Sequence, residues 1–330
     1  MSCEEVREAV RASGLFARDR PVIAMLSGGR DSTCLLDVAV ALLGPHAIAA
    51  LHVNYGLRED AHADERHCAA LCAQLGVELE VVRADSRPAA PRESVGVATA
   101  DAAVRTSGNL QAWARELRYA AAQRMALARD ALIATGHTAS DQVETILYRL
   151  AASPGRRALL GMPASEGRLI RPLLALTREQ TAAYCLARNL SWREDASNED
   201  ERFARARVRH QLVPALRAVH PAAEANVLRT AALLREETEL LDGLVEQELA
   251  GRASIEIARL RELPAALARM VVVRLAEDAT GAYVPQAGDR VQELLALAAR
   301  GGRAELHLGG QAGAVIAAGR LTMIKLPPRD

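Results

Sequence analysis

The sequence contains a single lysine, Lys325, among 41 basic residues in a chain of 330. Arginine therefore supplies nearly all of the positive charge. A nucleotide site of the Walker type needs a lysine in its glycine-rich loop, and none precedes residue 325, so that class of site is excluded. The 41 acidic residues balance the basic ones, and a net charge of zero neither requires nor excludes a nucleic-acid partner.

Aromatic residues make up only 3% of the chain, and there are only five cysteines. The core must therefore be built from Ala, Leu and Val. The cysteines form no disulfide framework and no C-x-x-C pair. No apolar run approaches the roughly 20 residues that span a membrane, and the first residues, MSCEEVREAV, are acidic, unlike a signal peptide. We expect a cytoplasmic protein with no membrane partner.

Short apolar runs alternate with helical patterns in the first half of the chain. The expected strands cover residues 22–26, 47–53, 78–83 and 131–135. The expected helices cover residues 32–43, 61–75, 110–128 and 138–150. This alternation predicts an α/β, Rossmann-like domain whose parallel sheet is covered on both faces. A further strand at 168–171 and helices at 178–189 and 201–218 are expected to complete it.

Ligands of such sheets bind at the carboxyl ends of the strands. Three polar stretches follow strand ends, so we expect them to converge on one crevice: residues 27–32, 52–58 and 136–144. Residues 85–107 have no periodic pattern, and we interpret them as a mobile flap over the site.

The character of the chain changes after Pro221. A long amphipathic helix is expected at 224–249, followed by helices at 264–277 and 288–300 and short strands at 305–308, 314–317 and 321–325. We therefore divide the chain into an α/β domain of residues 1–218 and a mainly helical domain of residues 219–330 that ends in short strands.

The stretch Ser27-Gly28-Gly29-Arg30-Asp31-Ser32 lies between the first strand and the first helix of this sheet. Its glycines allow backbone N–H groups to turn toward a phosphate, and the helix N-terminus favours the same negative charge. Asp31 can be a Mg²⁺ ligand, with the metal neutralising phosphate in place of a lysine. Such a site suits attack at the α-phosphorus of ATP, with loss of pyrophosphate. The alternative is an ordinary glycine turn in which Asp31 caps the helix.

His137, Asp141 and Glu144 are spaced i, i+4 and i+7, so they can share one helix face. A histidine with two carboxylates can bind Mg²⁺, hold an ammonium group or accept a proton. The alternative is a solvated helix face.

SGGRDS resembles the PP-loop motif SGGxDS of the N-type ATP pyrophosphatases. Other stretches resemble the tRNA(Ile)-lysidine synthetases, in the same order and at about the same spacing: LHVNYGLRED (51–60), NLQAWARELRYAA (109–121), ATGHTASDQVETILYRL (134–150), RPLLALTREQ (171–180) and WREDASNEDERFARARVRHQLVPAL (192–216). The resemblance covers residues 20–218.

This resemblance implies a reaction in which ATP adenylates the C2 oxygen of the wobble cytidine of the CAU-anticodon tRNA(Ile). The ε-amine of free L-lysine then displaces AMP to give lysidine. It implies ATP and Mg²⁺ as cofactors, with the metal on Asp31 and Asp141, and ATP bound by residues Ser27 to Ser32. It does not fix the oligomeric state, for which a homodimer is one option. It gives the second domain a structural or tRNA-contacting role.

The resemblance also assigns roles to individual side chains. His137 has a phosphate or proton role, and Asp141 and Glu144 position lysine or metal. Arg115 and Arg118, beside Tyr119, are candidates to clamp phosphate. Arg207, between Arg205 and Arg209, matches an arginine expected near AMP, and a basic surface for tRNA is its alternative. Aromatic side chains that could stack a flipped base are Tyr55, Trp113 and Trp192.

Four positions depart from the family pattern: Tyr55, Ser140, Pro154 and Ala206. They keep a second hypothesis open, that of a PP-loop amide synthase that adenylates a small carboxylate without tRNA. The two hypotheses share the adenylation step and differ in product. Sulfur transfer to tRNA is disfavoured because no C-x-x-C pair is present, and an inactive RNA-binding module would consume no ATP.

Overall fold

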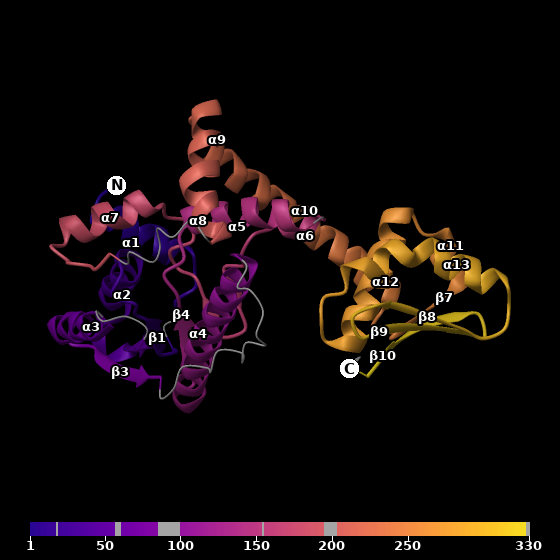
Figure 1. Ribbon diagram of the computed structural model, residues 1–330, viewed down its shortest axis with the longest axis horizontal. Coiled ribbons are helices and arrows are strands. Elements are labelled where there is room, and N and C mark those ends of the chain that lie inside the picture. The colour runs from indigo at the N-terminus through magenta and orange to yellow at the C-terminus, as the bar shows by residue number, and fades with distance from the viewer. Residues whose placement is uncertain (18, 57–60, 85–99, 154, 195–202, 328–330) are drawn as a thin grey trace. The chain divides into compact units, whose positions relative to one another are not determined.

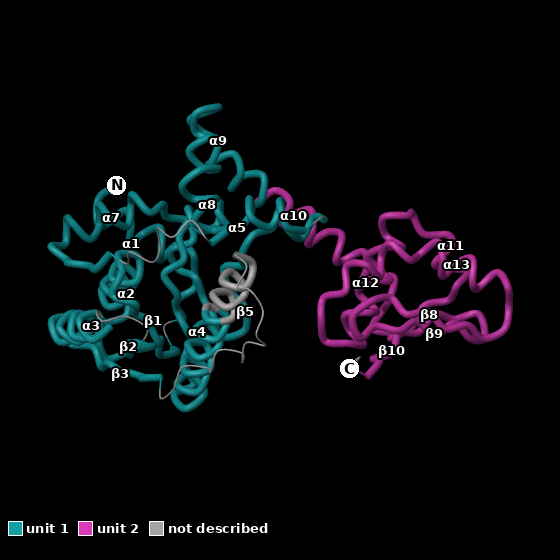
Figure 2. The backbone as a smooth tube through the Cα atoms, viewed as in Figure 1, with its two compact units in different colours: residues 1–231 teal, residues 232–330 magenta. Residues whose placement is uncertain are grey.

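The computed structural model describes residues 1–17, 19–56, 61–84, 100–153, 155–194 and 203–327 (Figure 1). It divides into two compact units, Met1–Ala231 and Ala232–Asp330 (Figure 2). The division lies within helix α10 (Ala223–Leu249) and thus later than the boundary expected after residue 218. The reason is that Val227 and Leu228, at the start of α10, pack against a hydrophobic cluster of the first unit.

The first unit is built on a six-stranded sheet with the order β3-β2-β1-β4-β6-β5. Its strands are β1 (Val22–Met25), β2 (Ile48–Asn54), β3 (Glu78–Arg83), β4 (Leu132–Ala134), β5 (Ser165–Glu166) and β6 (Leu169–Ile170). All neighbouring strands are parallel except β5 and β6. Every residue of β1, β2 and β4 is buried, as in parallel sheets covered on both faces. The predicted α/β fold class is confirmed.

Helices cover both faces of this sheet: α1 (Cys3–Ala12), α2 (Arg30–Leu43), α3 (Ala61–Leu75), α4 (Ala100–Arg129), α5 (Ala139–Ala152), α6 (Arg156–Leu159) and α7 (Arg178–Ala187). Alternate residues of β1 face opposite sides. Val22 and Ala24 belong to the cluster formed with α2, α3 and α7. Ile23 and Met25 belong to the cluster formed with α4.

Helix α4 begins at Ala100, ten residues before its predicted start. The prediction of a structureless flap is therefore wrong for residues 100–107. This segment, ADAAVRTS, contains no proline and is rich in alanine, the strongest helix former. Residues 85–99 of the predicted flap lie outside the described residues, as do Arg58, Pro154, Asp195, Ser197 and Asn198.

The predicted helix at 201–218 is divided into three segments: α8 (Ala204–Arg207), the π-helical turn η3 (Val208–Leu212) and α9 (Val213–Val219). Pro214 has no N–H group to donate within a regular helix. Single π-turns of this kind are frequent at functional sites.

The second unit combines helices with a four-stranded antiparallel sheet of order β7-β10-β9-β8. Its elements after α10 are β7 (Ser254–Glu256), α11 (Ile257–Glu262), α12 (Ala265–Thr280), α13 (Val291–Ala299), β8 (Ala304–Gly309), β9 (Ala312–Ala317) and β10 (Arg320–Lys325). Leu275, Leu294 and Leu321 form part of its own core. In the described part of the chain, no helix has the length and apolar character needed to cross a membrane.

Candidate active site

The loop between β1 and α2 is shaped by its own serines. The hydroxyl oxygens of Ser27 and Ser32 lie 3.0 Å apart, and the Ser32 hydroxyl donates to the Gly29 carbonyl at 2.8 Å. Gly28 has a φ of +84°, in the left-handed region that favours glycine. The N-cap of α2 is Gly29, which has no side chain to bond the first N–H groups of the helix. This helix end is therefore suited to an anion.

The loop after β4 approaches this glycine loop closely. A Cβ atom at Gly136 would lie 2.9 Å from the backbone carbonyl of Asp31 and 3.0 Å from the amide nitrogen of Ser32. Only glycine allows two backbones to come this near. A third strand end lies beside them, because His52 Nδ1 is 2.9 Å from the Leu26 carbonyl. The described parts of the three predicted stretches thus meet at one edge of the sheet.

Asp141 belongs to a capping box at the start of α5. Its Oδ2 accepts from the backbone N–H and the hydroxyl of Thr138, both at 2.8 Å, and its Oδ1 accepts from Arg178 at 2.8 Å. Burial alone would raise the pKa of this carboxyl, but Arg178 and the Thr138 N–H bond bring it below its usual value. Asp141 is therefore an anion held by neighbours from α5 and α7.

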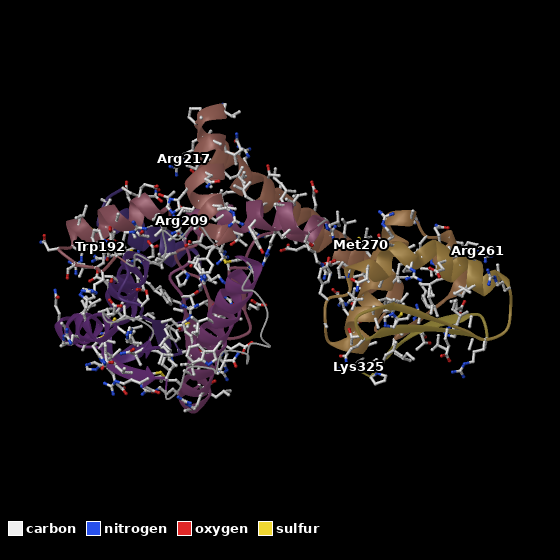
Figure 3. The ribbon with its side chains drawn as sticks, in the orientation of Figure 1. Trp192, Arg209, Arg217, Arg261, Met270 and Lys325 are labelled. Atoms are coloured by element: carbon white, nitrogen blue, oxygen red, sulfur yellow. The ribbon has the colours of Figure 1, made fainter. Side chains whose placement is uncertain are left out.

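Glu144 is buried and bonded to two arginines. Arg178 Nη1 donates to Oε1 at 3.1 Å, and Arg209 donates from Nε to Oε1 at 2.7 Å and from Nη2 to Oε2 at 3.1 Å. Arg209 comes from the π-helical turn η3 (Figure 3). A concave region of about 120 Å³ borders this cluster, lined by Glu144, Arg178 and Arg209 among others. Two carboxylates and two guanidinium groups thus form one charged cluster at the crevice.

His137 precedes α5, whose N-cap is Thr138, so it does not share a helix face with the two acids as the spacing suggested. Its Nδ1 lies 2.8 Å from the Thr135 hydroxyl. Burial lowers the pKa of His137 to about 4, with further lowering by Arg171, Arg205 and Arg118 against the opposing effect of Asp141. The imidazole is neutral near pH 7.

The two arginines of the "WARELRY" helix face different surroundings. Arg118 lies close enough to influence His137, and its Nε is buried with no hydrogen-bond partner among the described residues. Arg115 is exposed, and its guanidinium lies 4.7 Å from the ring centroid of Tyr119. The structure therefore brings Arg118, rather than Arg115, to the crevice.

The alternating arginines of α8 and η3 also separate. Arg205 donates to the Thr145 hydroxyl at 2.8 Å, and Arg209 bonds Glu144, so both turn toward α5. They are four residues apart, the spacing of one helix face. Arg207 lies between them and is exposed. Arg205 and Arg209 thus join the side of the crevice that α5 forms.

The aromatic candidates pack within the first unit. The rings of Tyr55 and Trp113 meet edge to face with centroids 6.1 Å apart. Trp192 is partly buried against the cluster that covers one face of the sheet.

Three residues of the crevice were not predicted from the sequence. Arg178 and Thr181 lie on α7, and Thr181 donates to Asp31 Oδ1 at 2.5 Å. Arg171 follows β6, is buried, and has an Nε with no partner among the described residues. Arg171 and Arg178 stand in the stretch RPLLALTREQ, whose resemblance to the family was the one available signal.

The described residues include no group of three or more His, Cys, Asp or Glu side chains arranged to hold a metal. Mg²⁺ in phosphate-transfer sites is commonly held by one or two carboxylates, with phosphate and water as further ligands. Asp31 offers one such carboxylate beside the glycine loop. Both acids have partners: Asp141 is bonded to Thr138 and Arg178, and Asp31 to Thr181 and Arg30. Asp31 fits a shared metal better because it stands at the glycine loop itself.

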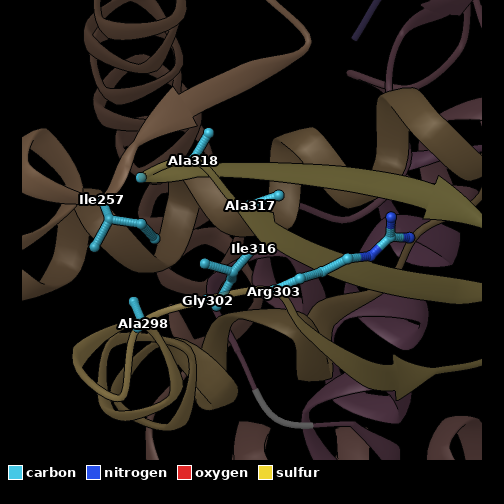
Figure 4. Close-up of a pocket in the computed structure, with 9 residues that line it drawn as sticks. Ile257, Ala298, Gly302, Arg303, Ile316, Ala317 and Ala318 are labelled. Carbon is cyan, nitrogen blue, oxygen red and sulfur yellow. The ribbon is translucent and has the colours of Figure 1, made fainter.

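A separate cavity of about 400 Å³ lies in the second unit, between the end of α13 and the turn after β9 (Figure 4). Its wall is mainly apolar, with Ile257, Ala298 and Ile316. Arg303, the charged residue of the lining, pairs with Glu305 at 2.7 Å and extends away from Ile257 in Figure 4. This lining lacks the acids and glycine loop of the crevice, so we assign the chemistry to the first unit.

The fold and this glycine loop define a nucleotide-binding α/β unit of the PP-loop class. Residues 4–216 match the PP-loop domain family, and the chain belongs to that family.

Curated relatives share more than this domain. A tRNA(Ile)-lysidine synthase of Pseudomonas fluorescens (strain Pf0-1) is 37% identical over 272 residues, which cover 77% of this chain and 57% of that protein. The enzyme of the same name from Pseudomonas aeruginosa is 38% identical over 230 residues, covering 68% of this chain and 48% of the relative. This chain thus spans about half the length of the curated relatives it matches.

Among solved structures, the U34-tRNA thiolase NcsA from Methanococcus maripaludis is similar with a TM-score of 0.55 and 15% identity. The similarity covers 70% of this chain and 78% of that one. At this identity it supports the shared fold alone.

Proposed function

We propose that this chain ligates free lysine to the C2 of the wobble cytidine of CAU-anticodon tRNA(Ile), consuming ATP and releasing AMP and pyrophosphate. The observation that carries the proposal is the junction of Asp31 with the Gly136–Glu144 segment at the carboxyl edge of the sheet. The lysidine synthases named above support it through their similarity to 77% and 68% of this chain. We place the activity in the cytoplasm.

In this proposal the glycine loop binds the phosphates of ATP. The N-terminus of α2 and the backbone of Gly28 and Gly29 face the negative charge. Asp31 would hold Mg²⁺, which supplies charge neutralisation at the departing pyrophosphate. The metal would stand where Walker-type sites use a lysine.

His137 is best suited to hydrogen bonding at a phosphate or at the reacting oxygen. A neutral imidazole with a pKa of about 4 is a poor acceptor for the proton of a lysine ammonium group, whose ordinary pKa is about 10.4. Arg118 and Arg171, each with a buried Nε lacking a partner among the described residues, supply positive charge around it. This arrangement favours stabilisation of a developing anion.

Glu144 and Asp141 would orient the cationic substrate, as carboxylates do for ammonium groups. In the structure they are bonded to Arg178 and Arg209. A lysine at this position must therefore exchange with, or lie beside, these arginines.

The test is mass spectrometry of tRNA incubated with the chain, ATP and lysine. We expect lysidine in CAU-anticodon tRNA(Ile) and none in the methionine tRNA that has the same anticodon. Release of AMP with a small carboxylic acid and no tRNA would instead support the amide synthase. If no ATP were consumed with any of these substrates, both the lysidine synthase and the amide synthase hypotheses would be wrong.

A further inference from the structure

Helices α2 and α7 meet along a polar seam of three layers. Asp31, Cys34 and Asp37 are spaced by three residues on α2. Their partners lie on one face of α7. Asp31 contacts Thr181, Cys34 contacts Cys185, and Asp37 contacts Tyr184 and Arg188. We call this set the α2–α7 seam. Its first layer, Asp31 with Thr181, ends at the glycine loop.

The deeper layers join α2 to α7 through buried side chains. The thiol of Cys34 contacts that of Cys185, and this contact, together with burial, raises the pKa of Cys34. The Tyr184 hydroxyl donates to Asp37 Oδ2 at 2.6 Å, and Arg188 donates to both oxygens of the same carboxylate at 3.1 and 3.2 Å. Both cysteines, Asp37 and Tyr184 are buried.

Thr181 has 0% exposure, and its hydroxyl has one proton to donate. Two acceptors are near: Asp31 Oδ1 at 2.5 Å and the carbonyl of Arg178 at 3.0 Å. The carboxylate is both charged and closer, so it is the stronger acceptor. Arg30 also contacts this carboxylate: its Nε donates to Oδ1 at 3.1 Å and its Nη2 to Oδ2 at 3.4 Å, both longer than the Thr181 bond.

We propose that Thr181 is a positioning residue that orients the Asp31 carboxylate toward a divalent cation bound with the nucleotide. This inference rests on the nucleotide site of the proposed function. A threonine hydroxyl is neutral, so it fixes one oxygen of Asp31 without adding to the positive charge that Arg30 already places beside the carboxylate. The arginines bonded to Glu144 act differently, because they neutralise the group they hold.

Variants at Thr181 can be compared with a control variant in the same seam. Thr181→Val removes the hydroxyl and keeps the shape, Thr181→Ser restores a hydroxyl, and Thr181→Ala is a second deletion should the valine variant not fold. Tyr184→Phe is the control, because it removes a hydroxyl that donates to an aspartate in the same seam, away from the glycine loop.

The measurement is Mn²⁺ binding by electron paramagnetic resonance, with a non-hydrolysable ATP analogue and without tRNA or lysine. We expect Thr181→Val and Thr181→Ala to weaken Mn²⁺ binding by about tenfold, the effect of one charge-assisted hydrogen bond. Thr181→Ser and Tyr184→Phe should stay near the wild-type value, although Tyr184→Phe lowers the melting temperature.

Unchanged Mn²⁺ binding in the deletion variants, or equal weakening in Tyr184→Phe, would overturn the positioning role. A wild-type chain that binds Mn²⁺ with nucleotide but forms no lysidine would remove the proposed function and leave this role intact. If the wild-type chain did not bind Mn²⁺, both the positioning role and the proposed function would be contradicted.

Discussion

Gly136 lies so close to Asp31 that a methyl group on its Cα would come within 2.9 Å of the Asp31 carbonyl. This contact joins two loops that follow β1 and β4, neighbouring strands of the sheet. The distance between the glycine loop and the histidine–acid segment therefore depends on the absence of a side chain at residue 136.

We expect Gly136→Ala to separate these loops. Forcing a methyl group against backbone atoms should cost about 1–3 kcal/mol in the free energy of unfolding, and nucleotide-dependent pyrophosphate exchange should fall with it. Gly243→Ala is the matched control, because a Cβ there meets nothing within 4 Å in the middle of α10. It should stabilise the chain by about 0.5–1 kcal/mol. Urea unfolding of both variants checks this, and equal stabilities would contradict it.

Asp31→Asn should abolish AMP and pyrophosphate formation. The amide keeps the size of the side chain but loses the charge that a cation needs. We expect a loss of about 100-fold or more in pyrophosphate exchange, on the scale of an electrostatic contact in an active site. Normal turnover would refute the assigned role of Asp31.

The pKa of His137 gives the stability of the chain a predictable dependence on pH. Since the pKa falls from 6.5 in the unfolded chain to about 4 in the folded one, the unfolded chain binds the extra proton between these values. Stability from this group is present above pH 6.5 and is lost as the pH falls toward 4. His137→Gln should lose less stability than wild type over this window, by at most about 3 kcal/mol. Equal slopes in urea unfolding would show that His137 is not the group responsible.

Glu144→Gln should destabilise the first unit strongly. The substitution takes the buried carboxylate away from Arg178 and Arg209, which keep Asp141 as a neighbour. Losing a hydrogen bond to a charged group costs about 1.5–3 kcal/mol. Glu179→Gln is the control, because its side chain is 67% exposed and 3.6 Å from Arg217. An exposed pair of this kind contributes about 0–1 kcal/mol. Similar losses of stability in both variants would contradict the burial of the cluster.

Arg207→Ala should weaken tRNA binding and leave adenylation unchanged. Its exposed position on α8 suits contact with phosphate, and losing one such contact should reduce the slope of log K against log salt by about one. Arg20→Ala, at the opposite edge of the sheet just before β1, should leave the slope unaltered. Filter binding at several salt concentrations checks both, and a slope unchanged in Arg207→Ala would remove this contact.

The amino-acid sequence alone was enough to predict the central strands and helices of the first unit and the glycine loop between β1 and α2. It did not predict helix α1, or β7 and α11 of the second unit. The predicted features depend on residues close together in the chain: apolar periodicity, glycine at a turn, and polar residues after strand ends. It also indicated Asp31, His137, Asp141 and Glu144 as residues of one crevice, because carboxyl ends of parallel strands share an edge.

The partners of these groups depend on how distant segments pack against one another. Thr181 reaches Asp31 across 150 positions of sequence, and Arg209 reaches Glu144 across 65. The tertiary structure also directed Arg118 rather than Arg115 toward His137, and it buried that histidine so that it stays neutral. The physical reason is that hydrogen bonding, charge pairing and burial depend on distances between segments that are far apart in the sequence. Local sequence patterns do not contain those distances.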